Sequence, residues 1–167
     1  QGNVSGTLAL GTSNLTGVGS VNVKASTTGL IPGNYTISRA GGNTWNLTGA
    51  NAGNISGAGA GGGALVFSNV RNLTDTGAGV FNMNGGSDGS VSGIMSAVGG
   101  RVDYTGYGSA PTFNLGGGAG TGMGGWIGIT TVTGRGAPDG TITGTGRTYN
   151  LTGANAGNSG AVSWTSF

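Results

Sequence analysis

Residues 44–54 read TWNLTGANAGN and residues 148–158 read TYNLTGANAGN, so an eleven-residue stretch recurs 104 positions later with one exchange. The exchange replaces Trp45 with Tyr149, one aromatic ring for another, and this predicts a core position in both copies. Internal repetition of this kind is typical of repeat architectures, in which each unit packs on its neighbours.

The relation continues past these two stretches. ALVFSNV at 64–70 resembles AVSWTSF at 161–167, now at an offset of 97. The seven-residue difference is close to the glycine-rich run GAGAGGG at 57–63, which the second copy lacks. The sequence therefore relates residues 44–70 to residues 148–167 as two copies of one unit.

A weaker relation reaches the beginning of the sequence. GNVSG at 2–6 matches GNISG at 53–57, and the likeness extends loosely over 2–17 and 53–75. The start, middle and end of the chain thus share one phase of a pseudo-repeat of about 100 residues. We predict that residues 1–167 form a single segment of a longer repeat array or fibre.

A triplet of an apolar residue, Asn or Asp, and a second apolar residue recurs along the chain. Side chains two positions apart lie on one face of an extended strand, so each triplet predicts a short, half-buried strand. Gly, Asn, Ser and Thr surround the triplets and predict turns. The chain is therefore expected to be all-β. The triplets are Val21-Asn22-Val23, Trp45-Asn46-Leu47, Phe81-Asn82-Met83, Val102-Asp103-Tyr104, Phe113-Asn114-Leu115 and Tyr149-Asn150-Leu151, with Leu8-Ala9-Leu10 and Tyr35-Thr36-Ile37 as variants.

A parallel β-helix, or β-solenoid, accounts for the tandem repeat better than a sandwich or a barrel. Its coils each contribute short strands that stack about 4.8 Å apart, and the turns between strands can lengthen without disturbing the ladder. With about 20–25 residues in each coil, the chain would form about seven coils.

Asparagine has two predicted roles in this architecture. It tolerates left-handed backbone angles, so Asn51, Asn54, Asn155 and Asn158 are expected at the corners of coils. The middle residues of the triplets, such as Asn46, are expected to face outward, and asparagines stacked in register can form amide ladders.

The composition excludes most catalytic and metal-binding chemistry. The 167 residues include 42 glycines and 6% charged residues, with no histidine, cysteine or glutamate. We therefore predict no enzyme activity, no catalytic or metal-binding residues and no cofactor. Six scattered cations against four anions do not make a nucleic-acid surface, and no apolar run is long enough for membrane insertion.

Three local features suggest sharper functions, each with a simpler structural interpretation. GGSDGSV at 85–91 resembles one copy of a calcium-binding solenoid motif, but a single copy favours a plain turn. The glycine runs at 57–63 and 116–125 are not followed by the Lys-Ser/Thr of a phosphate loop. Asp103, near Arg101, has no second acid beside it for polysaccharide cleavage, which favours a solvated strand face.

TYNLTGANAGN followed by SGAVSWTSF resembles the repeats of very large bacterial surface proteins of the filamentous haemagglutinin type, which are exported by two-partner secretion. The resemblance covers 44–70 and 148–167. It implies a right-handed parallel β-helix stalk that is secreted, extracellular, and used for cell adhesion or for building a biofilm matrix. It transfers no catalytic residues.

The function expected from the sequence is that of a structural or adhesive fibre. An uncapped solenoid end is an open sheet edge, so the expected partner is the same chain, either its continuing repeats or another copy, joined end to end. Cell-surface or matrix polysaccharide is a further candidate partner.

A ligand-binding solenoid is the alternative function. Trp126, Trp164, Tyr104 and Tyr107 could present rings to a carbohydrate, although Trp164 aligns with a core position of the first copy. Ice binders use rows of Thr-x-Thr triplets, and this chain has isolated triplets at 131–133 and 141–143.

Overall fold

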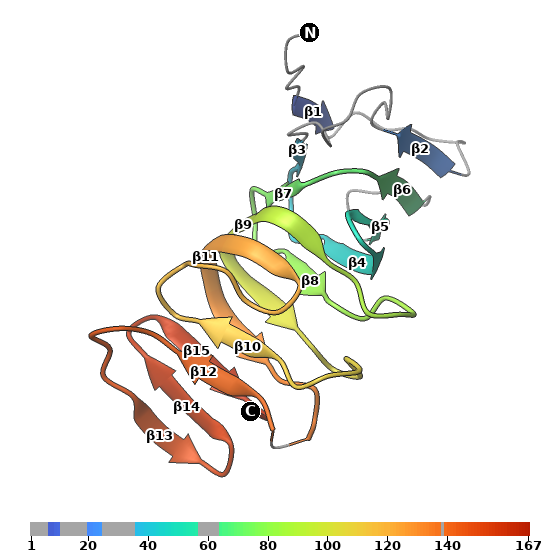
Figure 1. Cartoon of the computed structure of the whole chain (residues 1–167). Coiled ribbons are helices and arrows are strands. Elements are labelled where there is room, and N and C mark those ends of the chain that lie inside the picture. The colour runs from blue at the N-terminus through green and yellow to red at the C-terminus, as the bar shows by residue number, and fades with distance from the viewer. Residues whose placement is uncertain (1–6, 11–19, 25–35, 57–63, 138) are drawn as a thin grey trace, which may run out of the picture.

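The computed structural model describes residues 7–10, 20–24, 36–56, 64–137 and 139–167, and these residues form fifteen strands and no helix (Figure 1). The predicted all-β class is confirmed. The runs at 2–6 and 57–63 lie outside the described residues. The strands are β1 (Thr7–Leu10), β2 (Ser20–Lys24), β3 (Thr36–Arg39), β4 (Thr44–Gly49), β5 (Ala52–Ser56), β6 (Ala64–Ser68), β7 (Asn72–Asp75), β8 (Val80–Asn82), β9 (Val91–Asp103), β10 (Thr112–Asn114), β11 (Met123–Thr133), β12 (Thr141–Thr143), β13 (Asn150–Gly153), β14 (Ala156–Ser159) and β15 (Val162–Thr165).

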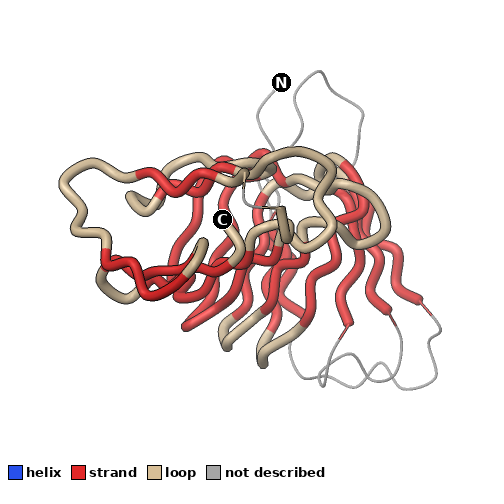
Figure 2. The backbone as a smooth tube through the Cα atoms, turned by 90° about the horizontal axis from the view of Figure 1, so that it is seen from below, coloured by secondary structure: helices blue, strands red, loops and turns tan. Residues whose placement is uncertain are grey.

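Most strands pair in parallel with a strand from a later part of the chain. One row runs β1, β3, β7 and then the first halves of β9 and β11. A second row runs β4, β8, the second halves of β9 and β11, and β15. A short third row pairs β10 with β12. Figure 2 shows these strands from below, where successive strands follow one another in a regular series.

The chain length between strands that are neighbours in a row varies, and the prediction of about 20–25 residues in each coil is wrong for most coils. Along the second row the register passes from Trp45 to Phe81 and then to Val102, and the first of these steps spans much more of the chain than the second. The longer step includes two additional strands, β5 and β6. Insertions therefore lie between rungs and leave the parallel pairing intact.

Two units of the sheet are antiparallel, contrary to the expectation of parallel ladders throughout. The strands β4, β5 and β6 form one three-stranded meander, and β13, β14 and β15 form the other. The chain reverses at Asn51 and at Asn155, whose φ angles are 54° and 55°. These two asparagines lie in turns, as predicted, because Asn accepts a left-handed backbone at low cost. The resulting sheet is mixed.

Aligned apolar side chains form the core along the second row. Trp45, Phe81, Val102, Val132 and Trp164 occupy successive register positions, and all five are buried. The Trp45 and Phe81 rings lie 5.9 Å apart between centroids. Fully burying a side chain of this size contributes about 1.5–3 kcal/mol. The predicted inward rows are therefore present, and each rung is covered by the next.

An amide ladder lies on the opposite face of the same strands. Asn82 donates through Nδ2 to Oδ1 of Asn46 at 3.2 Å, and Asn46 donates to Oδ1 of Asn54 at 3.0 Å. The predicted stacking of asparagines is confirmed here. Asn54 and Asn158, however, lie within β5 and β14 and not at corners, because the hairpin register places them opposite Asn46 and Asn150.

A buried carboxylate joins the two main rows. Asp75, at the end of β7, is 1% exposed. Its Oδ2 accepts hydrogen bonds from the backbone N of Asn43 at 3.0 Å, from Asn43 Nδ2 at 2.9 Å and from Trp45 Nε1 at 2.9 Å. Its Oδ1 accepts from Gly77 N at 2.8 Å. Four N–H donors offset the cost of burying this acid and fix β7 against the start of β4.

Replacing Asp75 should therefore destabilise the fold strongly. Asp75→Ala leaves four donors without their acceptor, and we expect a loss of about 3 kcal/mol in the free energy of unfolding, measured by urea titration. Asp88→Ala is the matched control, since it also removes one carboxylate, but Asp88 is exposed, and the donor to its carboxylate within the described ranges is Gly108 N. The control should lose about 1 kcal/mol or less. Equal losses would contradict the role assigned to Asp75.

Candidate functional site

The sequence repeat corresponds to a structural repeat of four strands. β3 to β6 in the first copy match β12 to β15 in the second, each as a short strand followed by an antiparallel meander. The preceding strand matches too. Thr7 of β1 pairs with Thr36, and Thr112 of β10 pairs with Thr141. The two partners are separated by the same number of residues in each pair. The structural repeat is thus longer than the eleven-residue match indicates.

The ring pairs inside the two meanders have nearly the same geometry. Trp45 and Phe67 lie 6.4 Å apart at an interplanar angle of 61°, and Tyr149 and Trp164 lie 6.1 Å apart at 65°. The amide pairs also agree, at 3.0 Å in the first copy and 3.1 Å between Asn150 and Asn158 in the second. Each copy is therefore locally complete.

Two equivalent glycines allow this ring packing. Gly53 lies opposite Phe67, and a Cβ on Gly53 would lie 2.8 Å from Phe67 Cζ and 2.2 Å from the backbone oxygen of Asn46. Gly157 lies opposite Trp164 with similarly short distances to the indole ring. The second glycine of GANAGN is therefore required in both copies, because an aromatic ring packs directly over it.

The chain also leaves both meanders in the same way. Asn69 and Ser166 have left-handed φ angles of 57° and 62°. The residue after each one donates its backbone N–H to the turn asparagine, as Val70 does to the oxygen of Asn51 at 3.0 Å. Phe167 makes the equivalent bond to Asn155 at 3.2 Å.

In the first copy, residues 80–90 cover the outer edge of β4. β8 pairs with the first half of that strand. Gly85 then donates its N–H to the oxygen of Leu47 at 2.8 Å, and Ser90 donates to Gly49 at 3.1 Å. Gly89 packs so closely that a Cβ there would lie 2.3 Å from Leu47 Cβ. Leu47 is consequently 0% exposed.

In the second copy the equivalent edge is open. Among the described residues β13 pairs with β14 alone, and β12 pairs with β10 alone. Leu151, the equivalent of Leu47, is 80% exposed, and Tyr149, the equivalent of Trp45, is 40% exposed. The prediction that both copies of this position lie in the core is therefore wrong for the second copy. The repeat has the right local geometry but no described neighbour on that side.

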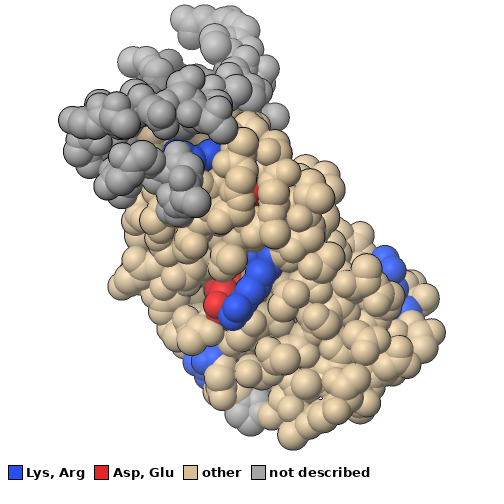
Figure 3. All heavy atoms as spheres, turned by 180° about the vertical axis from the view of Figure 1, so that it is seen from behind, with Lys and Arg blue, Asp and Glu red and all other residues tan. Residues whose placement is uncertain are grey.

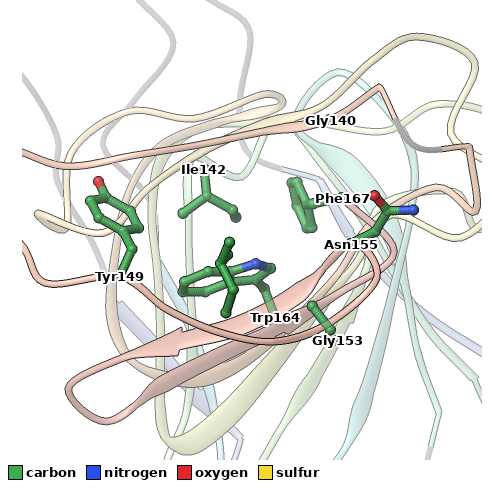
Figure 4. A pocket seen from close by; sticks show the side chains of 9 residues that line it. Gly140, Ile142, Tyr149, Gly153, Asn155, Trp164 and Phe167 are labelled. Atoms are coloured by element: carbon green, nitrogen blue, oxygen red, sulfur yellow. The ribbon is translucent and has the colours of Figure 1, made fainter.

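The open end of the second copy contains a groove with an apolar, partly aromatic lining (Figure 4). The groove is lined by Ile142 of β12, by Leu151 and Trp164 of the meander, and by Tyr149, which precedes β13. Phe167 also lines the groove and contacts Tyr104, with ring centroids 6.4 Å apart. We define the open end as the outer edges of β12 and β13 together with this groove.

The charged residues considered in the sequence analysis make structural contacts elsewhere. Asp88 accepts the backbone N–H of Gly108 at 2.9 Å. The GGSDG segment around it is a turn that covers Leu47 through Gly85 and Gly89. Asp103 pairs with Arg101 at 2.7 Å, and Thr105 donates to it. Among the described residues no cluster of three acidic, histidine or cysteine side chains could hold a metal ion.

A second ion pair joins Arg135 and Asp139. The hydrogen bond from Arg135 lowers the pKa of the Asp139 carboxyl below its usual range. Arg135 also donates to the backbone oxygens of Tyr107 and Gly108. These contacts hold Arg135 and Asp139 against residues 107–108. The face seen in Figure 3 shows only scattered charges on an otherwise uncharged surface.

Of the aromatic residues considered as sugar contacts, Tyr104 and Trp164 are buried in the core, and Tyr107 and Trp126 are partly buried against it. Tyr104 is buried and donates to the oxygen of Thr121 at 2.8 Å, and burial raises the pKa of its hydroxyl. Burial, with a smaller effect from Asp88, also raises the pKa of Tyr107. Trp126 stacks on Phe113 at 5.1 Å. Trp164 lines the groove at the open end, together with Tyr149 and Phe167.

The threonine triplets continue for no more than one neighbouring strand among the described residues. Thr131 and Thr133 have Ser163 and Thr165 beside them on one side, but Arg101 and Asp103 on the other. In the pair of β10 with β12, Thr141 lies beside Thr112, but Thr143 lies beside Asn114. A regular Thr-x-Thr array is not formed at these positions.

The open end was not predicted from the sequence. A further match between the copies could have revealed it: Thr36-Ile37-Ser38 matches Thr141-Ile142-Thr143, which extends the repeat to β3 and β12. With the copies aligned in this way, residues 71–91 cover the first copy, and no described strand has the equivalent place on the second.

No family model matches this chain, and searches of curated proteins and of solved structures found no match either. The resemblance to filamentous haemagglutinin repeats therefore stays a prediction. Within the part of the chain that the structure describes, no helix has the length and apolar character needed to cross a membrane.

The two equivalent leucines give a direct test of the difference between the copies. Leu47→Ala should lower the free energy of unfolding by about 2–5 kcal/mol, because it leaves a cavity beneath residues 85–89. Leu151→Ala makes the same chemical change at an exposed position and should alter it by about 0.5 kcal/mol or less. Urea unfolding of both variants measures the difference. A large loss for Leu151→Ala would mean that its edge is already covered in solution.

Proposed function

We propose that this chain is a segment of a non-enzymatic, structural or adhesive extracellular fibre or stalk, built as a right-handed parallel β-helix with antiparallel hairpins inserted between rungs. In this proposal, the repeats belong to a bacterial surface or biofilm-matrix protein and meet end to end. The last coil of one repeat, which is one full turn of the chain, stacks on the first coil of the next. One observation carries the proposal: the same unit occurs twice, once covered by a further strand and once with the equivalent edge open.

Sheet edges supply the physical reason for end-to-end contact. An open strand edge presents unpaired N–H and C=O groups and templates further pairing. The open end adds to this an exposed leucine and a partly exposed tyrosine in positions that are buried in the first copy. Covering these groups removes apolar surface from water and pairs the edge at the same time.

The extracellular and adhesive parts of the proposal rest on the sequence. The likeness to haemagglutinin-type repeats, the absence of cysteine and the 6% charged content fit a long stalk whose stability comes from stacking. The parallel rows with aligned core side chains support the solenoid interpretation.

A ligand-binding solenoid is the second candidate, and the groove at the open end favours it. Tyr149 and Trp164 border the groove, and aromatic rings bind the apolar faces of sugars. In that case a polysaccharide should bind the monomeric chain, and Tyr149→Ala should abolish the binding. A carbohydrate-binding titration at a concentration where the chain is monomeric separates the two functions.

Self-association tests the fibre proposal directly. The average mass in sedimentation should rise with protein concentration, and electron microscopy should show rods joined at their ends. Leu151→Asp should keep the chain monomeric, because a carboxylate at the contact cannot be desolvated without a partner. Val98→Asp is the control, since Val98 is 69% exposed on the side of β9. A chain that stays monomeric at all concentrations, or association that both variants disrupt equally, would contradict end-to-end stacking.

A further inference from the structure

The first copy specifies what should cover the open end. After the exit at Val70, the chain forms β7 on the edge of β3, with Leu73 opposite Ile37. It then forms β8 on the edge of β4, with Phe81 opposite Trp45. Both of these edges have open counterparts in β12 and β13. The covering layer in the first copy is residues 71–91, a single coil that pairs with both edges.

The second copy has a cation, Arg147, where the first copy has the neutral side chain of Asn43. In the first copy, Asn43 and Trp45 donate to the buried carboxylate of Asp75. The residue 104 positions after Asn43 is Arg147, which is exposed to solvent. A guanidinium is a stronger donor to a carboxylate than an amide and is suited to paired contacts. The second copy therefore presents a cation at the position from which the first copy binds an acid.

The amide ladder points to the same kind of partner. In the first copy, Asn46 donates to Asn54 and accepts from Asn82 of the covering strand. In the second copy, Asn150 makes the first of these bonds, to Asn158 at 3.1 Å, and is exposed on the side that the covering strand would occupy.

We propose that the open end binds one further parallel coil of defined chemistry, a polypeptide with the pattern of residues 71–91. Its first strand pairs with β12 and carries an acidic residue that binds Arg147. Its second strand pairs with β13 and carries an aromatic residue that packs on Tyr149, followed by an asparagine that donates to Asn150 Oδ1. The inference rests on the proposed function and adds the side chains that the incoming coil must supply.

A chain extended by one coil tests this proposal. A second copy of residues 71–91 is appended after Phe167, which is the position equivalent to Val70. Because the chain has no cysteine, Leu151→Cys introduces a single thiol at the centre of the open edge. Alkylation of this thiol should be about ten-fold slower or more in the extended chain than in the original chain, since burial blocks the reagent. An extension of the same composition in scrambled order is the control.

Two further variants test the charge contact. Within the extended chain, Arg147→Gln and, separately, asparagine in place of the first aspartate of the extension should each speed alkylation. Made together, they should have little more effect than either alone, because both break one contact. In the chain without an extension, Arg147→Gln should leave the alkylation rate unchanged.

Two results would overturn the proposal. The first is alkylation of Leu151→Cys at the same rate with the native and the scrambled extension. The second is protection that neither charge change affects, which would mean that the acidic residue has no part in recognition. Val98→Cys, placed on the side of β9, should react at one rate in every chain and reports that the fold is intact.

If the extended chain does not fold, a synthetic peptide with the sequence of residues 71–91, or its scrambled form, is added to the Leu151→Cys chain without an extension. The alkylation rate should then be slower with the native peptide than with the scrambled one. The extension acts within one molecule, so its result is independent of self-association. Protection in the extended chain together with a strictly monomeric original chain would sustain this inference and refute homotypic fibre assembly.

Discussion

The inner strands of the two main rows have a neighbour at both edges and depend on both. A short strand has few hydrogen bonds of its own, and its apolar side chains are buried only when the next rung covers them. The row from Trp45 to Trp164 shows this dependence, because its five aligned side chains are buried by their neighbours along the row. The stability of any one rung is therefore a property of the rungs on either side.

The internal repeat separates the effect of sequence from the effect of surroundings. The hairpin, its left-handed turn asparagine, its glycine beneath a ring and its amide pair form equally well in both copies. The burial of Leu47 and the exposure of Leu151 differ only because residues 80–90 cover one of them. Local geometry is thus encoded within the unit, and burial comes from the neighbouring coil.

This distinction explains which features could be predicted from the sequence. Alternation in the triplets indicated the strands and their inward faces, and Asn51 and Asn155 were identifiable as turn residues because few other residue types accept their backbone angles. The antiparallel hairpins were missed, since parallel and antiparallel strands have the same alternation. The exposure of Tyr149 was missed because a side chain's pattern does not reveal whether a further strand covers it. Asp75 could not have been predicted as a structural centre, because Asn43 and Trp45, which donate to it, lie on a distant part of the chain.

The one-way pairing of β4, β8, β9, β11 and β15 gives the stacked rows a head and a tail that are chemically distinct. Two tails brought face to face would pair their edge strands antiparallel, because a two-fold axis reverses the strand direction. A symmetric dimer through this surface would therefore interrupt the parallel register that aligns the core side chains along the rows. An assembly that continues the parallel rows has every unit oriented alike, and its two ends are therefore different surfaces.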